Sequence, residues 1–68
     1  MDLHQLKTFQ AIASIGSFSQ AAEALGYSQS TVSEHIKSLE AELKTRLFKR
    51  AGSKQVVITH AGEMLLAY

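Results

Sequence analysis

With 68 residues, the chain has room for one domain, and its formal net charge of +1 does not by itself indicate a nucleic-acid partner. The absence of cysteine excludes a disulfide framework and a thiolate zinc site, so helix packing has to stabilise a small core. Neither a membrane-spanning apolar run of ~18 residues nor a secretory signal peptide is present, so we expect a folded, cytoplasmic protein.

The first three predicted elements are helices. Asp2 begins a capping-box pattern, apolar residues then recur at helical spacing, and Gly16 can supply the left-handed turn that ends the helix. Ser17 begins a second capping-box pattern, and the short helix that follows ends at Gly26. Ser28 is a third N-cap, and an apolar stripe predicts a helix that continues to about residue 43.

After residue 46 the periodicity changes from helix to strand. Residues 47–50 and 56–59 are rich in β-prone side chains, and residues 51–54 between them are typical of a turn. Thr59 then caps a final helix that has barely two turns when the sequence ends, which indicates a piece of a longer protein. The order helix, helix, helix, two-stranded ribbon, helix predicts a mainly α fold.

The relative positions of four residues are typical of a helix-turn-helix: Ala22, Gly26, Val32 and Ile36. Ala22 lies four residues before Gly26 and has to be small, because the following helix crosses closely over it. Gly26 supplies the positive φ of the tight turn. Val32 and Ile36, one helical turn apart, hold the second helix against the first. An ordinary helical hairpin shows the same spacing by chance, so the third helix and the ribbon are needed to favour a helix-turn-helix.

When Val32 and Ile36 face inward, the opposite face of the same helix is polar. Its N-terminal end is the part that enters the major groove in helix-turn-helix proteins. Glutamine can bond adenine at two positions, and serine or threonine can pair with several base edges. This face predicts double-stranded DNA as the partner, and its candidate contacts are Gln29, Ser30, Thr31, Ser33, Glu34 and Lys37.

A basic segment follows the third predicted helix. From Lys44 to Lys54 the chain contains five basic residues and no acid. On a near-neutral chain such a patch is a modest indication of phosphate binding, although basic runs are most often solvated surface. The backbone N–H groups after Ser28 add a weak positive pole at the start of the third helix, which also favours phosphate.

Several spaced motifs occur together along the chain: Leu3-x-x-Leu6-x-x-Phe9, Gly16-Ser17-Phe18-x-x-Ala21-Ala22, Leu25-x-x-Ser28-Gln29, Val32-Ser33, Ile36-x-x-Leu39-Glu40, Leu43-x-x-x-Leu47-Phe48-x-Arg50 and Thr59-x-Ala61-Gly62. With them the chain resembles, over essentially its full length, the N-terminal domain of LysR-type transcriptional regulators. The resemblance implies a winged helix-turn-helix: a three-helix core, a wing formed by the ribbon, and a linker helix that pairs two subunits. It also implies an effector-binding domain, which is absent from this sequence.

The resemblance implies domain boundaries and site residues. Residues 1–59 would form the winged helix-turn-helix domain, with the motif at about 18–37 and the wing at about 47–59, and residues 60–68 would begin the linker helix. The implied major-groove residues are Gln29, Ser30, Thr31 and Ser33, to which the polar face adds Glu34. The implied backbone and wing contacts are Ser28, Lys37, Arg50, Ser53 and Lys54.

The implied partners are operator or promoter DNA, further copies of the chain, and a small-molecule effector bound only by the missing domain. The full-length protein would be a homodimer or homotetramer through the linker helix, and Met64 and Leu65 are expected in the core or at that interface. No membrane, metal or cofactor is expected. No enzyme is expected either, because the sequence has no nucleophile–base spacing and no phosphate loop.

Two alternatives remain open. The first is a different winged-helix regulator, in which the wing or the first helix makes the main DNA contacts. The second is a helical protein-interaction module that keeps the fold without binding DNA, and Glu34 favours it because an acid on the DNA-facing side opposes phosphate. Salt dependence of binding to random duplex would separate these alternatives, since only a DNA binder releases counterions steeply.

Four features depart from the family pattern. Ser30 stands where many members have proline, and Glu34 replaces what is often arginine. This glutamate removes a phosphate or guanine contact but can accept a hydrogen bond from cytosine N4. Lys44 replaces the usual glycine after the third helix, at a cost of roughly 1 kcal/mol if the left-handed turn is kept. The segment from Arg50 to Thr59 is one residue longer than the common wing.

Other residues invite a metal-binding or catalytic interpretation. The three histidines lie on separate predicted elements without ligand spacing, so surface positions are expected for all of them: His4, His35 and His60. The third predicted helix would still allow its histidine to reach a phosphate. Glu40 and Glu42 stand two apart on a helix and are expected to point away from each other, which excludes a catalytic pair.

Overall fold

The computed structural model describes residues 1–52 and 55–67, in which four α-helices and one two-stranded antiparallel sheet are formed. In chain order the elements are α1 (Leu3–Ile15), α2 (Phe18–Leu25), α3 (Gln29–Leu43), β1 (Phe48–Arg50), β2 (Val56–Ile58) and α4 (His60–Ala67). The predicted mainly α fold and its order of elements are confirmed. None of the helices within these ranges is long and apolar enough to cross a membrane.

The first three helices begin at the N-caps that the sequence predicts. The Asp2 carboxylate accepts from the Gln5 backbone N–H at 2.8 Å, and the Gln5 side chain returns the bond, which completes a capping box. Ser17 and Ser28 each accept from the third residue of their helices, and such caps contribute about 1 kcal/mol each. No reciprocal bond completes the second predicted box in the described part of the chain, where the Ser17 hydroxyl pairs with Ser19 at 3.1 Å.

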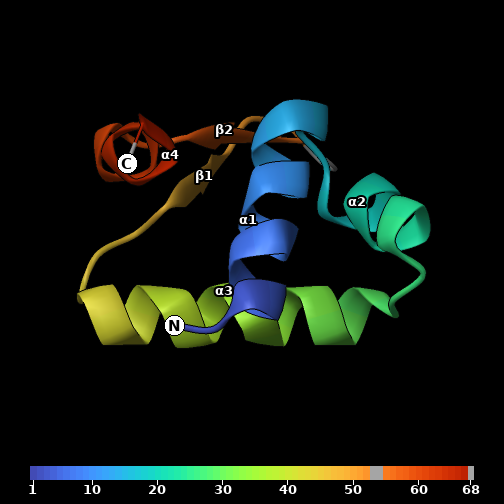
Figure 1. Cartoon of the computed structure of the whole chain (residues 1–68). Helices are drawn as coiled ribbons and strands as arrows, with labels where there is room; N and C mark the ends of the chain where they lie inside the picture. The colour runs from blue at the N-terminus through green and yellow to red at the C-terminus, as the bar shows by residue number, and fades with distance from the viewer. Residues whose placement is uncertain (53–54, 68) are drawn as a thin grey trace.

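The core lies where α1 crosses α2 and α3, with the ribbon closing one side (Figure 1). Its fully buried apolar residues come from these three helices and from the start of the ribbon: Phe9, Ile12, Ala21, Ala22, Val32, Ile36, Leu39, Leu47 and Phe48. The Phe48 ring meets Phe9 at 5.5 Å between centroids and Phe18 edge-on at 5.9 Å. Such pairs contribute about 0.5–1.5 kcal/mol beyond area burial, so aromatic packing joins the ribbon to α1 and α2.

The ribbon presents two faces of different character. β1 and β2 pair antiparallel with Arg50 opposite Val56 and Lys49 opposite Val57. Side chains alternate along a strand, so Arg50 shares a face with the buried Phe48 and Lys49 lies on the other face. Because Phe48 points into the core, the same alternation directs Arg50 along the side of the ribbon that adjoins the helices.

α4 is fixed to the base of the ribbon. The Thr59 hydroxyl donates to the Arg46 carbonyl at 2.6 Å and accepts from the Gly62 N–H at 3.1 Å, so the predicted cap is confirmed. A Cβ built on Gly62 would lie 2.5 Å from Ile58 Cγ1 and 2.7 Å from the Leu47 carbonyl oxygen. Glycine therefore permits an approach between α4 and the ribbon that any side chain would block.

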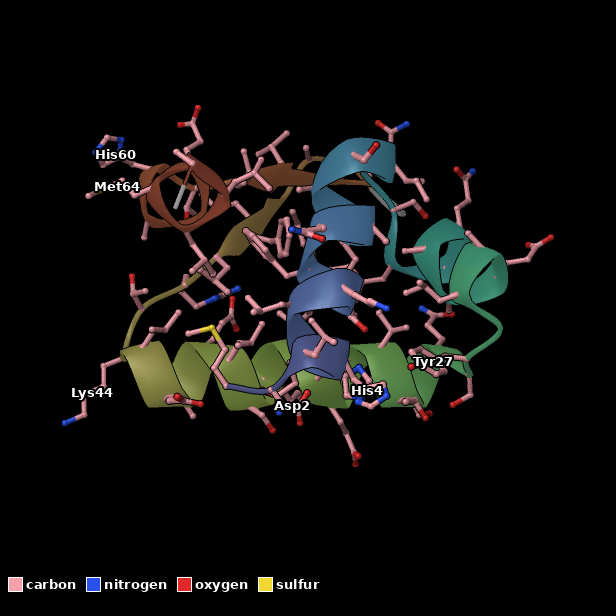
Figure 2. The ribbon with its side chains drawn as sticks, in the orientation of Figure 1. Asp2, His4, Tyr27, Lys44, His60 and Met64 are labelled. Carbon is pink, nitrogen blue, oxygen red and sulfur yellow. The ribbon has the colours of Figure 1, made fainter. Side chains whose placement is uncertain are left out.

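Lys44 ends α3 in the left-handed conformation, with φ 57° and ψ 41°. The left-handed turn that the family forms with glycine at this position is thus kept with lysine. Figure 2 shows the Lys44 side chain extending from the end of α3 into open space. The cost is a local clash between Cβ and the backbone, about 1 kcal/mol.

Candidate nucleic-acid interface

The helix-turn-helix is formed by α2, the turn at residues 26–28, and α3. Gly26 has φ 75°, and no atom lies within 4 Å of a Cβ built on it, so the turn requires glycine for its backbone conformation alone. Ala22 is buried, and Val32 and Ile36 are both inside the core. The inward positions predicted from spacing are confirmed, and they fix which face of α3 is turned outward.

The outward face of α3 carries a row of polar side chains. Gln29, Ser30, Glu34 and Lys37 are exposed, Ser33 is half-buried, and together the five line a shallow depression. Within the described part of the chain, no side-chain hydrogen bond or ion pair joins any of them to another residue. Their donors and acceptors therefore point toward solvent.

Thr31 lies away from this row. It is two residues after Gln29 and therefore roughly 200° further around the helix. Its hydroxyl pairs with the Ser28 hydroxyl at 2.9 Å, and its backbone N–H donates to the same Ser28 oxygen at 3.2 Å. The structure therefore separates Thr31 from the other candidate major-groove residues and places it with Ser28 at the helix N-terminus.

His35 lies on the same flank as Thr31 and is held by α1. Its Nδ1 lies 2.8 Å from the Thr8 hydroxyl oxygen, and its ring meets the Tyr27 ring edge-on at 5.4 Å. The expected surface position is wrong for this histidine, which is half-buried. The expectation is confirmed for His4 and His60, which are both exposed. Figure 2 shows His60 on the outer side of α4.

A groove of about 440 Å³ separates the outward face of α3 from the ribbon. Its α3 wall is formed by Gln29, Ser33 and Lys37, and the facing wall by Lys49, Arg50 and Gln55. Its floor includes the apolar side chains of Phe18, Ile36, Phe48 and Val56. The core packing that holds the ribbon against the helices also sets the distance between the two walls.

The groove is basic. The cations that line it are Lys37, Arg46, Lys49 and Arg50, and among the described lining residues they face one carboxylate, that of Glu40. That carboxylate is already used within the protein. Glu40 Oε2 accepts from the Leu47 N–H at 2.8 Å and lies 3.8 Å from Arg46 Nε. An anionic surface with a ridge that fits between the walls would be attracted along its whole length.

The structure adds three residues to the candidate site. Arg46, Lys49 and Gln55 line the groove but were not among the predicted contacts, although the first two belong to the basic segment. The basic segment was the available signal for Arg46 and Lys49, whereas strand alternation beside Phe48 assigns only Arg50 to this side of the ribbon. Two predicted wing contacts, Ser53 and Lys54, lie outside the described residues.

Residues 3–63 match the family described as bacterial regulatory helix-turn-helix protein, lysR family. The HTH-type transcriptional regulator CysB of Thiocapsa roseopersicina is 45% identical over 69 residues, which cover all of this chain and 51% of that protein. The chain spans between 20% and 51% of the length of the curated relatives that it resembles.

Two similar solved structures contain DNA. The CbnR_DBD–DNA complex superposes with a TM-score of 0.92 at 34% identity, covering 98% of this chain and 76% of that chain. The complex of BenM_DBD with the benA site 1 DNA has a TM-score of 0.91 at 37% identity, covering 100% of this chain and 78% of that one. The fold and the sequence similarity therefore agree.

Proposed function

Because the chain belongs to the LysR family of bacterial regulatory helix-turn-helix proteins, we propose that it binds double-stranded DNA as part of a transcriptional regulator. The observation that carries the proposal is the basic groove between the polar face of α3 and the ribbon. A helix fits the major groove, and cations on either side of it fit the flanking phosphates.

In this proposal the two walls have different tasks. The row on α3 faces base edges, which present a distinct donor and acceptor pattern for each base pair in the major groove: Gln29, Ser30, Ser33 and Glu34. The cations flanking that row meet phosphates, namely Lys37 on α3 and Lys49 and Arg50 on the wing. Ser28 and Thr31 lie at the N-terminus of α3, where free backbone N–H groups favour phosphate.

We propose further that the full-length protein binds DNA as a homodimer or homotetramer assembled through α4. On that helix Met64 is 64% exposed and Leu66 48% exposed, whereas Leu65 packs against the core. Figure 2 shows Met64 on the outer side of α4. Detection of a small-molecule effector is assigned to the part of the relatives that this chain does not cover, and the site of action is the cytoplasm, where bacterial DNA lies.

The test is a titration of binding to random duplex over a range of salt concentrations. A domain that neutralises Z phosphates shows a slope of about −0.9Z in a plot of log K against log salt. A steep slope supports DNA binding by this surface. A binding constant that does not change with salt, or no binding at low salt, would contradict the proposal and favour the alternative of a protein-interaction module.

A further inference from the structure

Glu34 places a carboxylate in the middle of the face that is proposed to meet DNA. It is exposed and shares the shallow depression on α3 with Ser30, Ser33 and Lys37. In the ranges that the structure describes, its carboxylate has no protein hydrogen-bond donor, unlike Glu40, which receives the Leu47 N–H. The Glu34 oxygens are therefore available to a ligand.

A carboxylate in this place has a physical cost that depends on DNA sequence. It is repelled by phosphates, and it loses hydration when the major groove covers it. The second cost is recovered only where a base edge offers a hydrogen-bond donor opposite the carboxylate. A duplex bound through this face is thus selected for a donor at one position.

Two bases offer a donor in the major groove, cytosine through N4 and adenine through N6. The adenine amino group lies between two acceptors, N7 of the same base and O4 of the paired thymine, and both repel a carboxylate. The cytosine amino group has the guanine O6 on one side and only the C5–H edge of its own base on the other. Cytosine therefore suits a carboxylate better than adenine.

We infer that Glu34 is a specificity-determining residue that selects cytosine at one position of each DNA half-site by accepting a hydrogen bond from N4. The inference rests on the proposed function, because α3 must lie in the major groove for Glu34 to meet a base. Lys37, three residues further along the helix, is a neighbour of Glu34 and offsets part of its repulsion from the phosphates.

The experiment is selection of bound sequences from a random duplex pool at low salt with three proteins: the wild-type chain, Glu34→Gln and the control Glu23→Gln. The control removes the same charge from an exposed position on α2 that lines neither the groove nor the depression. The wild type and the control are expected to enrich cytosine at one position, by roughly tenfold over other bases. Glu34→Gln is expected to prefer adenine there, because an amide bonds adenine N6 and N7 together.

A chemical probe tests the hydrogen bond itself. Methylation of the selected cytosine at N4 leaves one N–H for pairing with guanine and puts a methyl group where the donated hydrogen lay. It is expected to weaken wild-type binding several-fold and to leave the binding of Glu34→Ala unchanged. Because Glu34 is exposed and bonded to no described residue, both variants should retain the wild-type circular dichroism spectrum.

Three outcomes would overturn the inference. The first is a Glu34→Gln variant that binds every sequence more tightly with the wild-type base preferences, since the carboxylate would then only repel. The second is a Glu34→Gln variant that loses a wild-type preference for a base other than cytosine. The third is equal weakening of the wild type and Glu34→Ala by N4 methylation. Absence of any duplex binding by the wild type would instead refute the proposed function.

Discussion

The backbone N–H of Val56 in β2 donates to the carbonyl oxygen of Gly16, the residue that ends α1, across 3.0 Å. The other strand is held from the opposite end by the Phe48 ring, which packs between two aromatic rings of the helices. Both strands are therefore fixed to the three-helix core. As a result, variants of one wall of the groove leave the other wall in place, and their effects on DNA binding can be compared.

Replacement of Gln29 by alanine is expected to change sequence preference. Gln29 lies at the start of α3 on the outward face, where a base edge can be read. Its loss should relax selectivity at one position of each half-site by roughly 1–3 kcal/mol. The salt dependence should barely change, because no charge is removed. The measurement is binding to a selected duplex and to single-substituted versions of it; equal weakening of all of them would mean that α3 does not read bases.

Replacement of Arg50 by alanine is expected to weaken binding to selected and random duplex alike. Arg50 lines the ribbon wall of the groove, and the loss of one phosphate contact lowers the salt slope by about 0.9 per subunit. Lys44→Ala is the matched control, because this substitution removes the same charge from a residue that lies outside the groove. If the salt slope of Arg50→Ala equals that of Lys44→Ala, the ribbon is not a DNA-contacting wing.

Glu40→Ala is expected to destabilise the domain by about 1–3 kcal/mol, because it leaves the N–H of the buried Leu47 without its acceptor. Glu42→Ala is the matched control. Its carboxylate contacts the amino group of Met1 at 2.6 Å on the surface, and such pairs contribute less than about 1 kcal/mol. Urea denaturation measures both, and Glu40→Gln should fall between wild type and alanine since its amide oxygen can still accept. Equal loss in Glu40→Ala and Glu42→Ala would contradict the assigned role.

Lys44→Gly is expected to stabilise the domain by up to about 1 kcal/mol, since glycine adopts the left-handed conformation at the end of α3 without strain. The gain is reduced by loss of a positive charge from the helix C-terminus, and Lys44→Ala measures that loss with the strain retained. Thermal unfolding should therefore rank the melting temperatures as Lys44→Gly above wild type and Lys44→Ala below it. A melting temperature of Lys44→Gly below that of Lys44→Ala would show that φ at this residue is not strained.

Val32→Asp is expected to unfold the domain, because Val32 is fully buried and the new carboxylate has no partner between the helices. The cost belongs to the severe range of single substitutions, several kcal/mol. Ser30→Asp, two residues earlier on the exposed face, should keep the fold and lose DNA binding. Circular dichroism measures whether each variant folds, and a native-like thermal melt of Val32→Asp would place Val32 outside the core.

The parts of the fold that sequence predicts well are those decided within one helical turn. Asp2, Ser17, Ser28 and Thr59 all cap the helices that follow them, because each cap bond joins residues three apart. The left-handed turn after α3 was considered only as a condition, from the glycine that the family usually has there, and the structure keeps it at Lys44. The mainly α class and the polar face of α3 follow from periodicity, which the core confirms.

The parts that sequence does not predict depend on how the helices cross. His35 bonds Thr8 on α1, which lies 27 residues earlier in the chain, and only the rotation of α3 about its axis brings the two together. Thr31, by contrast, leaves the outward row through helical periodicity alone, about 200° from Gln29, and the sequence interpretation overlooked this. For Glu40 the sequence supplied a family motif and the exclusion of a catalytic pair, whereas its hydrogen-bond partner is the backbone N–H of Leu47. Packing between elements sets these relationships, and each residue around a helix changes direction by about 100°.

The Thr59 hydroxyl bond to Arg46 and the close approach of α4 to the ribbon at Gly62 hold α4 against the base of the ribbon. Closely packed interiors deform little, and the ribbon is itself fixed to the three helices through Val56 and Phe48, so α4, the ribbon and the helices form one packed unit. A second subunit that packs on the exposed side of α4 would therefore set the orientation of the whole domain, including the outward face of α3.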